Sequence, residues 1–93
     1  MTDIKKILAE RDLTYGKFEN HACISQMLKN VLKGDERWYF LAPDQREALE
    51  MIMHKTARII NGNPNYVDSW VDIAGYSQLV VNRLNSEAEC TKD

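Results

Sequence analysis

Apolar and polar residues alternate along this chain with the period of α-helices, and no segment shows the two-residue period of a strand. In four segments apolar residues recur every three to four positions, so that each segment has an apolar face. The caps agree with this pattern, since Thr2 or Asp3 suits the start of the first segment and Pro43 the first turn of the third. The pattern predicts an all-α protein, a small bundle of about four helices. The four predicted helices are residues 3–11, 17–33, 43–61 and 66–84.

Glycines mark the ends of the first three predicted helices. Gly16 lies in the turn after the first helix, where it is free to take a positive φ. Gly34 and Gly62 stand where the second and third helices should end. The connection at residues 61–65 is short and consists of turn-forming residues. We therefore expect the third and fourth helices to form an antiparallel hairpin.

Two parts of the sequence carry more apolar surface than so small a bundle can cover. The connector at residues 34–42 holds four large apolar side chains in a row, Trp38 to Leu41, which should pack under the bundle or against a partner. The fourth predicted helix is apolar around nearly its whole circumference, as a buried helix is. Its apolar residues are Val67, Trp70, Val71, Ile73, Ala74, Tyr76, Leu79, Val80, Val81 and Leu84. We expect this helix to lie centrally or between subunits of a homo-oligomer, most simply a dimer.

Length and composition restrict the protein to one small globular domain. The chain has 93 residues, of which 44% are hydrophobic and 28% charged, with a net charge of −2. We assign residues 1–84 to one domain and residues 85–93 to a frayed polar tail. The acidic balance gives no strong signal for nucleic-acid binding, and no apolar run is long enough to span a membrane. With only Cys23 and Cys90, neither a disulfide framework nor a zinc site is expected, and the protein should be cytoplasmic.

Two acidic pairs are the main candidates for chemistry. Asp68 and Asp72 lie four residues apart in the fourth predicted helix, and Glu47 and Glu50 lie three apart in the third, so each pair shares a helix face. Oxygen-only acidic clusters are what Mg²⁺ or Mn²⁺ prefers. The alternatives are that Asp68 complements the helix dipole and that the glutamates belong to a solvated face.

Histidines and basic residues extend this set of candidates. His54 and Arg58 continue the stripe that begins at Glu47 and Glu50. His21 falls in the middle of the apolar face of the second predicted helix, where it either is a satisfied core residue or borders a pocket. Tyr15, just before that helix, would then line the same pocket.

Three stretches of the sequence resemble a family of small phage and prophage proteins of uncharacterised function. They are Glu10 to Phe18 (ERDLTYGKF), Glu50 to Gly62 (EMIMHKTARIING) and Asp68 to Tyr76 (DSWVDIAGY). The resemblance covers about residues 4–84 and implies action in a bacterial host cell, but it implies little about activity.

More distantly, the third and fourth predicted helices resemble the MazG-like all-α nucleoside triphosphate pyrophosphohydrolases. That group carries an ExxE pair on one helix and an ExxD pair on a later one, and the four acids hold Mg²⁺. Glu47 and Glu50 match the first pair, and Asp72 matches the final acid. The third acid departs from the pattern, because ExxD would place it at Ser69 whereas the sequence has Asp68. The resemblance favours a pyrophosphohydrolase, and this departure leaves as an alternative a site that binds nucleotides without cleaving them.

Three functions are therefore open. The first is a Mg²⁺- or Mn²⁺-dependent pyrophosphohydrolase, in which the catalytic and metal-binding residues would be Glu47, Glu50, Asp68 and Asp72. The second is a metal-free binder that sequesters a nucleotide, or a nucleotide signal of bacterial anti-phage defence. The third is a helical protein-interaction module. In the two nucleotide hypotheses the candidate ligand-binding residues are Tyr15, His21, Trp38, His54, Lys55, Arg58 and Tyr76.

Overall fold

The computed structural model describes residues 3–90, and it confirms the all-α prediction. The described part contains four α-helices and one short 3₁₀ helix, η1, and no strand. The elements are α1 (Ile4–Tyr15), α2 (Phe18–Lys33), η1 (Glu36–Phe40), α3 (Pro43–Asn61) and α4 (Val67–Cys90). None of these helices is long and apolar enough to cross a membrane.

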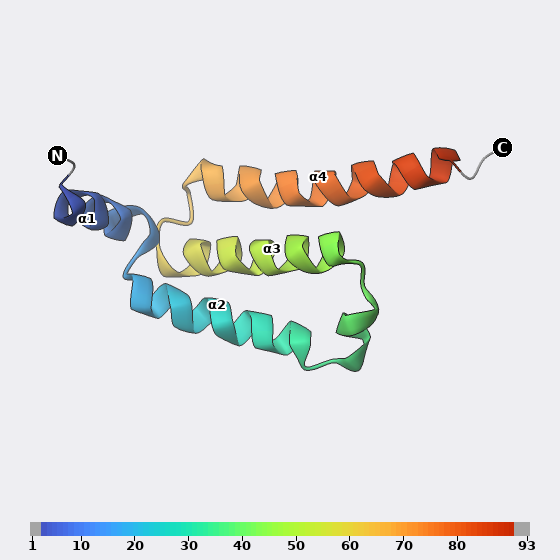
Figure 1. Cartoon of the computed structure of the whole chain (residues 1–93). Helices are drawn as coiled ribbons and strands as arrows, with labels where there is room; N and C mark the ends of the chain where they lie inside the picture. Colours follow the sequence, from blue (N-terminus) through green and yellow to red (C-terminus); the bar gives the residue numbers. More distant parts are fainter. Residues whose placement is uncertain (1–2, 91–93) are drawn as a thin grey trace.

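The helices α2, α3 and α4 lie side by side in one layer, with α3 in the middle (Figure 1). The short helix α1 lies at the end of the layer where α3 ends and α4 begins (Figure 1). Sequence analysis expected α4 to be central or between subunits, but within the chain α4 is at the edge and packs on α3. Packing within one chain therefore does not explain why α4 is apolar around nearly its whole circumference.

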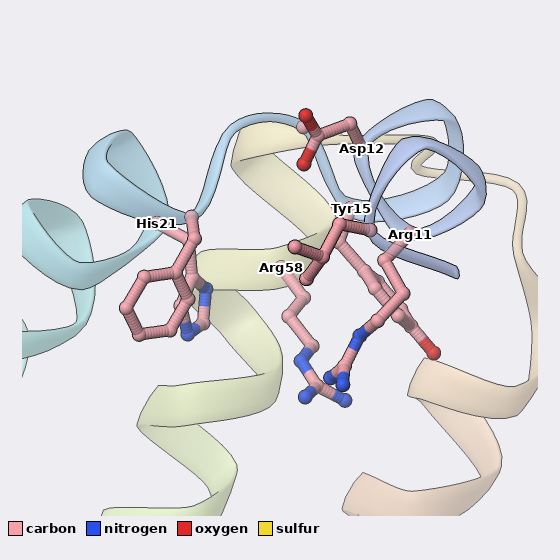
Figure 2. Close-up of a pocket in the computed structure, with 8 residues that line it drawn as sticks. Arg11, Asp12, Tyr15, His21 and Arg58 are labelled. Carbon is pink, nitrogen blue, oxygen red and sulfur yellow. The ribbon is translucent and has the colours of Figure 1, made fainter. Parts of the chain in front are cut away.

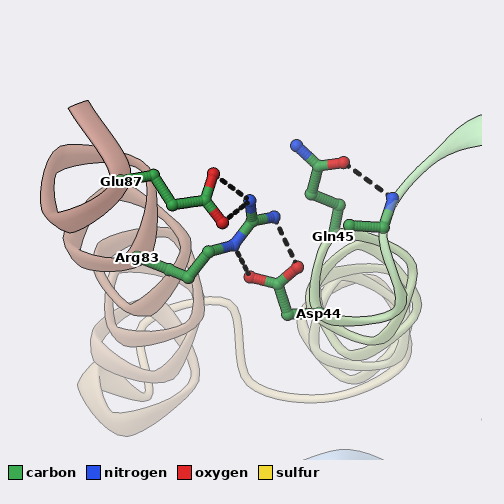
Figure 3. A network of polar contacts seen from close by, with 5 residues as sticks. Asp44, Gln45, Arg83 and Glu87 are labelled. Carbon is green, nitrogen blue, oxygen red and sulfur yellow. Dashed lines mark hydrogen bonds and ion pairs between the residues drawn. The ribbon is translucent and has the colours of Figure 1, made fainter. Parts of the chain in front are cut away.

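Two ion pairs set the register of the antiparallel pair α3 and α4. Lys55 Nζ lies 2.9 Å from an oxygen of Asp72, and Arg83 binds Asp44 through two hydrogen bonds of 2.6 and 2.8 Å. Arg83 also donates to Glu87 one turn later (Figure 3). Since both cross-helix pairs have residue numbers that add to 127, residue n of α3 lies level with residue 127 − n of α4. The predicted hairpin is confirmed.

Two helices are longer than the sequence pattern indicated. The first was expected to end near Arg11 but continues to Tyr15, and only Gly16, with a φ of +76°, ends it. The fourth continues beyond Leu84 to Cys90, within the stretch that was expected to be a frayed tail. Neither stretch contains a glycine or proline, so nothing in its backbone opposes helix formation.

The turn between α1 and α2 packs directly against the turn between α3 and α4. The Asn61 side chain donates hydrogen bonds to the carbonyls of Tyr15 and Lys17, each 2.9 Å long. The two glycines, Gly16 and Gly62, lie at this crossing. A Cβ atom on either would overlap backbone atoms of the other turn. The contact places α1 beside the end of α3.

The aromatic connector was expected to pack under the bundle or against a partner, and within the chain one of its aromatic residues is buried. Trp38 is buried, with 6% of its surface exposed, whereas Tyr39 and Phe40 are 64% and 84% exposed. Apart from Trp38, the buried apolar residues of the described chain are Ala48 and Ala57, and no large side chain is fully buried. The layer thus has almost no core of its own.

Because the two turns pack closely, we predict that an alanine changes the free energy of unfolding in opposite directions at Gly62 and at Gly75. Gly62→Ala should lower the free energy of unfolding by about 2 to 3 kcal/mol, because the added methyl group overlaps the backbone of Thr14 and Tyr15. Gly75→Ala, in the middle of α4 with open space around it, is the control and should raise it by about 0.5 to 1 kcal/mol. Urea unfolding measures both, and equal effects would contradict the close packing of the turns.

Candidate functional site

A cavity of about 330 Å³ lies where α1, α2 and α3 meet (Figure 2). The turn crossing creates it, because α1 is held beside the ends of α2 and α3. Its lining combines aromatic and aliphatic side chains with two arginines, one histidine and one aspartate. The residues that line it are Leu8, Arg11, Asp12, Tyr15, Gly16, Phe18, His21 and Arg58.

Two guanidinium groups converge on one tyrosine ring in this cavity. The Arg58 guanidinium lies 4.4 Å from the centre of the Tyr15 ring, and that of Arg11 lies 5.9 Å from it. Neither arginine forms an ion pair with a carboxylate of the described residues. Figure 2 shows the Asp12 carboxylate turned away from both. Two guanidinium groups that lie together and pair with no carboxylate of the described residues form a site suited to a negatively charged ligand.

A pair of histidines borders the same cavity. The rings of His21 on α2 and His54 on α3 meet edge to face, with 4.5 Å between their centres. Burial, together with nearby Arg58 and Lys29, lowers the pKa of His21, and burial and His21 lower the pKa of His54 to about 4. Both imidazoles are therefore neutral near pH 7, and the positive charge of the site resides on its arginines and lysines.

His21 also carries a polar atom without a partner. The residue is only 4% exposed, and its Nδ1 has no hydrogen-bond partner among the described residues. The hydroxyl of Ser25, one turn along α2 and 3% exposed, is likewise without a described partner. Buried polar groups of this kind normally have partners. His21 lines the cavity, so a bound ligand is one source of the missing hydrogen bond.

The four acidic candidates are separated in the chain. Asp72 pairs with Lys55, on the side of α3 that faces α4. Glu50 pairs instead with Lys33 of α2, at 3.2 Å. By the register of the hairpin, Glu50 lies level with residue 77 of α4, five residues or about 7.5 Å along the axis from the level of Asp72. The two acidic pairs thus belong to different parts of the layer.

The remaining two acids do not bridge this gap. Glu47 is exposed and lines a separate groove with Glu50 and Trp38. Asp68 is exposed at the start of α4, where a hydrogen bond with it raises the pKa of Tyr66. No three His, Cys, Asp or Glu residues of the described chain are grouped so that they could hold a metal ion. Within one chain, the arrangement does not fit the four-acid metal site that the resemblance implied.

The cavity gathers some of the predicted ligand-binding residues and adds others. Tyr15, His21 and Arg58 line it, and His54 contacts His21. Lys55 lies near enough to lower the pKa of both histidines. Two predicted residues lie elsewhere, Trp38 in the groove beside η1 and Tyr76 on the surface of α4.

Five residues that line this cavity were not predicted from the sequence: Leu8, Arg11, Asp12, Gly16 and Phe18. Of these, Arg11 offers a cation and Phe18 an aromatic ring. Arg11 was placed at the end of the first helix, but with the helix continuing to Tyr15 the two residues lie one turn apart on one face. Phe18 is the first residue of α2, where it is 74% exposed and lines the cavity. One sequence signal indicates the position of Arg11: no glycine or proline lies between Arg11 and Gly16, so the first helix can continue and bring Arg11 and Tyr15 onto one face.

Comparison with known proteins places the chain in a family. A family model described as a domain of unknown function, DUF6378, matches residues 1–84. The chain belongs to this family. No curated protein and no solved structure matches it. This family assignment covers residues 1–84 and brings no activity with it.

The neutral histidines predict that acid destabilises the folded protein. Because the folded pKa values lie below 6.5, the unfolded chain binds more protons below that pH. The histidine contribution is complete above pH 6.5 and is lost as the pH falls toward 4. Between pH 7 and 5 we expect His54 to account for a loss of about 1 to 2 kcal/mol. Urea midpoints at both pH values check this. His54→Gln should flatten the change, and an unchanged slope would contradict it.

Proposed function

We propose that this protein binds a nucleotide in the cavity between α1, α2 and α3, and that it holds the nucleotide without cleaving it. The observation that carries the proposal is the pair of guanidinium groups of Arg11 and Arg58 over the Tyr15 ring, to which no carboxylate of the described residues is paired. Because the protein has a net charge of −2, a general excess of basic residues does not explain why two arginines lie together in this cavity. Planar guanidinium groups bind phosphate oxygens through paired hydrogen bonds.

The rest of the cavity supplies groups for the base and the sugar. The Phe18 ring is largely exposed and lines the cavity, so it offers a free face on which a base can stack. The unpartnered Nδ1 of His21 offers a hydrogen bond to a base edge or a ribose hydroxyl. The volume of about 330 Å³ is at the lower end of the range for small-molecule sites, which suits a mononucleotide that is partly open to solvent.

The acidic residues favour binding over hydrolysis. The MazG-like mechanism requires four carboxylates around Mg²⁺, whereas Glu50 and Asp72 are each paired with a lysine and lie at different levels of the layer. The unpaired cations lie in the α1–α2–α3 cavity instead. A site that uses cations to hold the phosphates requires no metal ion.

The biological role that follows from this proposal is sequestration. The sequence resembles a family of phage and prophage proteins. A small binder of that kind in the host cytoplasm would remove a nucleotide, or a nucleotide signal of anti-phage defence, from solution. The identity of the base is decided by the Phe18 and His21 side of the cavity. The phosphate side, Arg11 and Arg58, sets most of the affinity.

The proposal predicts nucleotide binding in the absence of metal. Calorimetric titration of the protein with ATP, GTP, dTTP and cyclic di-AMP in EDTA should give saturable binding of at least one of them. Arg58→Gln should weaken that binding ten- to a hundredfold, because a hydrogen bond to a charged group contributes about 1.5 to 3 kcal/mol. Arg37→Gln is the matched control, because it removes the same charge outside the cavity. Arg37 belongs to η1 and pairs with Asp35, the residue that precedes η1.

The outcomes separate the three functions. Binding in EDTA that Arg58→Gln weakens and Arg37→Gln does not supports the cavity. Release of pyrophosphate that depends on Mg²⁺ and is abolished by Asp72→Asn would instead support the pyrophosphohydrolase. If no nucleotide binds with or without Mg²⁺, the proposal is wrong and the interaction module is favoured.

A further inference from the structure

The layer formed by α2, α3 and α4 has two unlike faces. At 100° per residue, the positions that point out of the layer on one side carry only uncharged side chains, and most of them are large and apolar. We call this side the apolar face. It consists of Ile24, Met27, Leu28 and Val31 of α2, Leu49, Met53, Thr56 and Ile60 of α3, and Trp70, Ile73, Ser77, Val81 and Leu84 of α4.

The opposite face of the layer carries the charges. Lys29, Lys33, Glu47, Arg58 and Asp72 all project on that side, by the same helical geometry and by the ion pairs Lys33–Glu50 and Lys55–Asp72. The candidate nucleotide cavity opens on this charged side, because Arg58 lies there. The two faces therefore differ in kind, and the apolar face is independent of the proposed ligand site.

The apolar face is open to solvent in the single chain. Val31 is 75% exposed, Ile60 62% and Trp70 53%. A shallow apolar groove of about 300 Å³ runs along the same side between α3 and α4, with Leu49 and Ile52 on one wall and Val80 on the other. Soluble monomers seldom leave so large a continuous apolar surface uncovered.

The total surface shows how much is left uncovered. A monomer of 10.8 kDa normally has an accessible surface of about 5,500 Å², whereas this chain has 7074 Å². Its radius of gyration is 16.5 Å, against about 12 Å for a compact chain of this length. The excess of about 1,500 Å² is what one subunit of a stable, obligate dimer buries in its interface.

We infer that the apolar face is the interface with a second copy of this chain. Two layers that meet through this face form a two-layer helical bundle with a shared core, which is the arrangement by which most domains bury their apolar side chains. A face without charges can pack on its own copy around a two-fold axis without placing like charges together. The charged faces, each with its nucleotide cavity, then lie on the outside of the dimer.

Two measurements on the unmodified protein test the interface. Analytical ultracentrifugation at micromolar concentration should give twice the mass of the 10.8 kDa chain. Iodide quenching should find both tryptophans protected, because Trp38 is buried within the chain and Trp70 would be covered by the second copy. A monomeric mass, or one freely quenched tryptophan, overturns the inference, and another partner would then cover this face.

A matched pair of substitutions locates the interface. Ile60→Glu and Leu79→Glu each introduce one charge at an apolar residue of nearly equal exposure, 62% and 64%, but Leu79 lies on the charged side. We expect Ile60→Glu to shift the protein to monomer or to unfolded chain, and Leu79→Glu to remain dimeric. If Ile60→Glu unfolds, a rise in the melting temperature of the unmodified protein with concentration still identifies the dimer. Dimers of equal stability in both variants would exclude this face.

Discussion

The contact between the two interhelical turns is the constraint on which the rest of the structure depends. The Asn61 side chain binds the carbonyls of Tyr15 and Lys17, and the glycines at positions 16 and 62 allow the two backbones to meet. Without this contact α1 has little to hold it, since every residue from Ile4 to Leu13 is exposed. With it, α1 forms one wall of the cavity and brings Arg11 over the ring that Arg58 also contacts.

The positive charge of the cavity lies on its arginines, because both nearby histidines are neutral. Burial of the pair formed by His21 and His54 beside Arg58 makes a further positive charge costly, so their pKa values fall. The permanent charges of the arginines then remain available to a ligand. Asp12 also lines the cavity, but its carboxylate is turned away from both guanidinium groups (Figure 2) and forms no ion pair with them.

The same thin architecture explains both the site and the exposed surface. A single layer of three helices can bury side chains only along its two seams, and small residues such as Ala48 and Ala57 fill them. Both faces stay accessible, one charged and one apolar. The charged face carries the candidate cavity, and the apolar face leaves uncovered the area that we propose a second layer occupies. α4 is thus an edge helix whose apolar residues contact α3 on one side and, by our inference, a second copy of the chain on another.

Much of the helical structure could be predicted from local signals. The bounds of α3 follow from Pro43 and Gly62, and the antiparallel hairpin follows from the short turn after Gly62, because these signals act within a few residues. The candidate site could not be predicted in this way. Spacings of three and four residues place each acidic pair on one helix face, but only the register and the lysine partners of Glu50 and Asp72 decide that the two pairs lie apart. Convergence of Arg11 with Arg58 likewise depends on two distant turns meeting, and tertiary packing alone determines that contact.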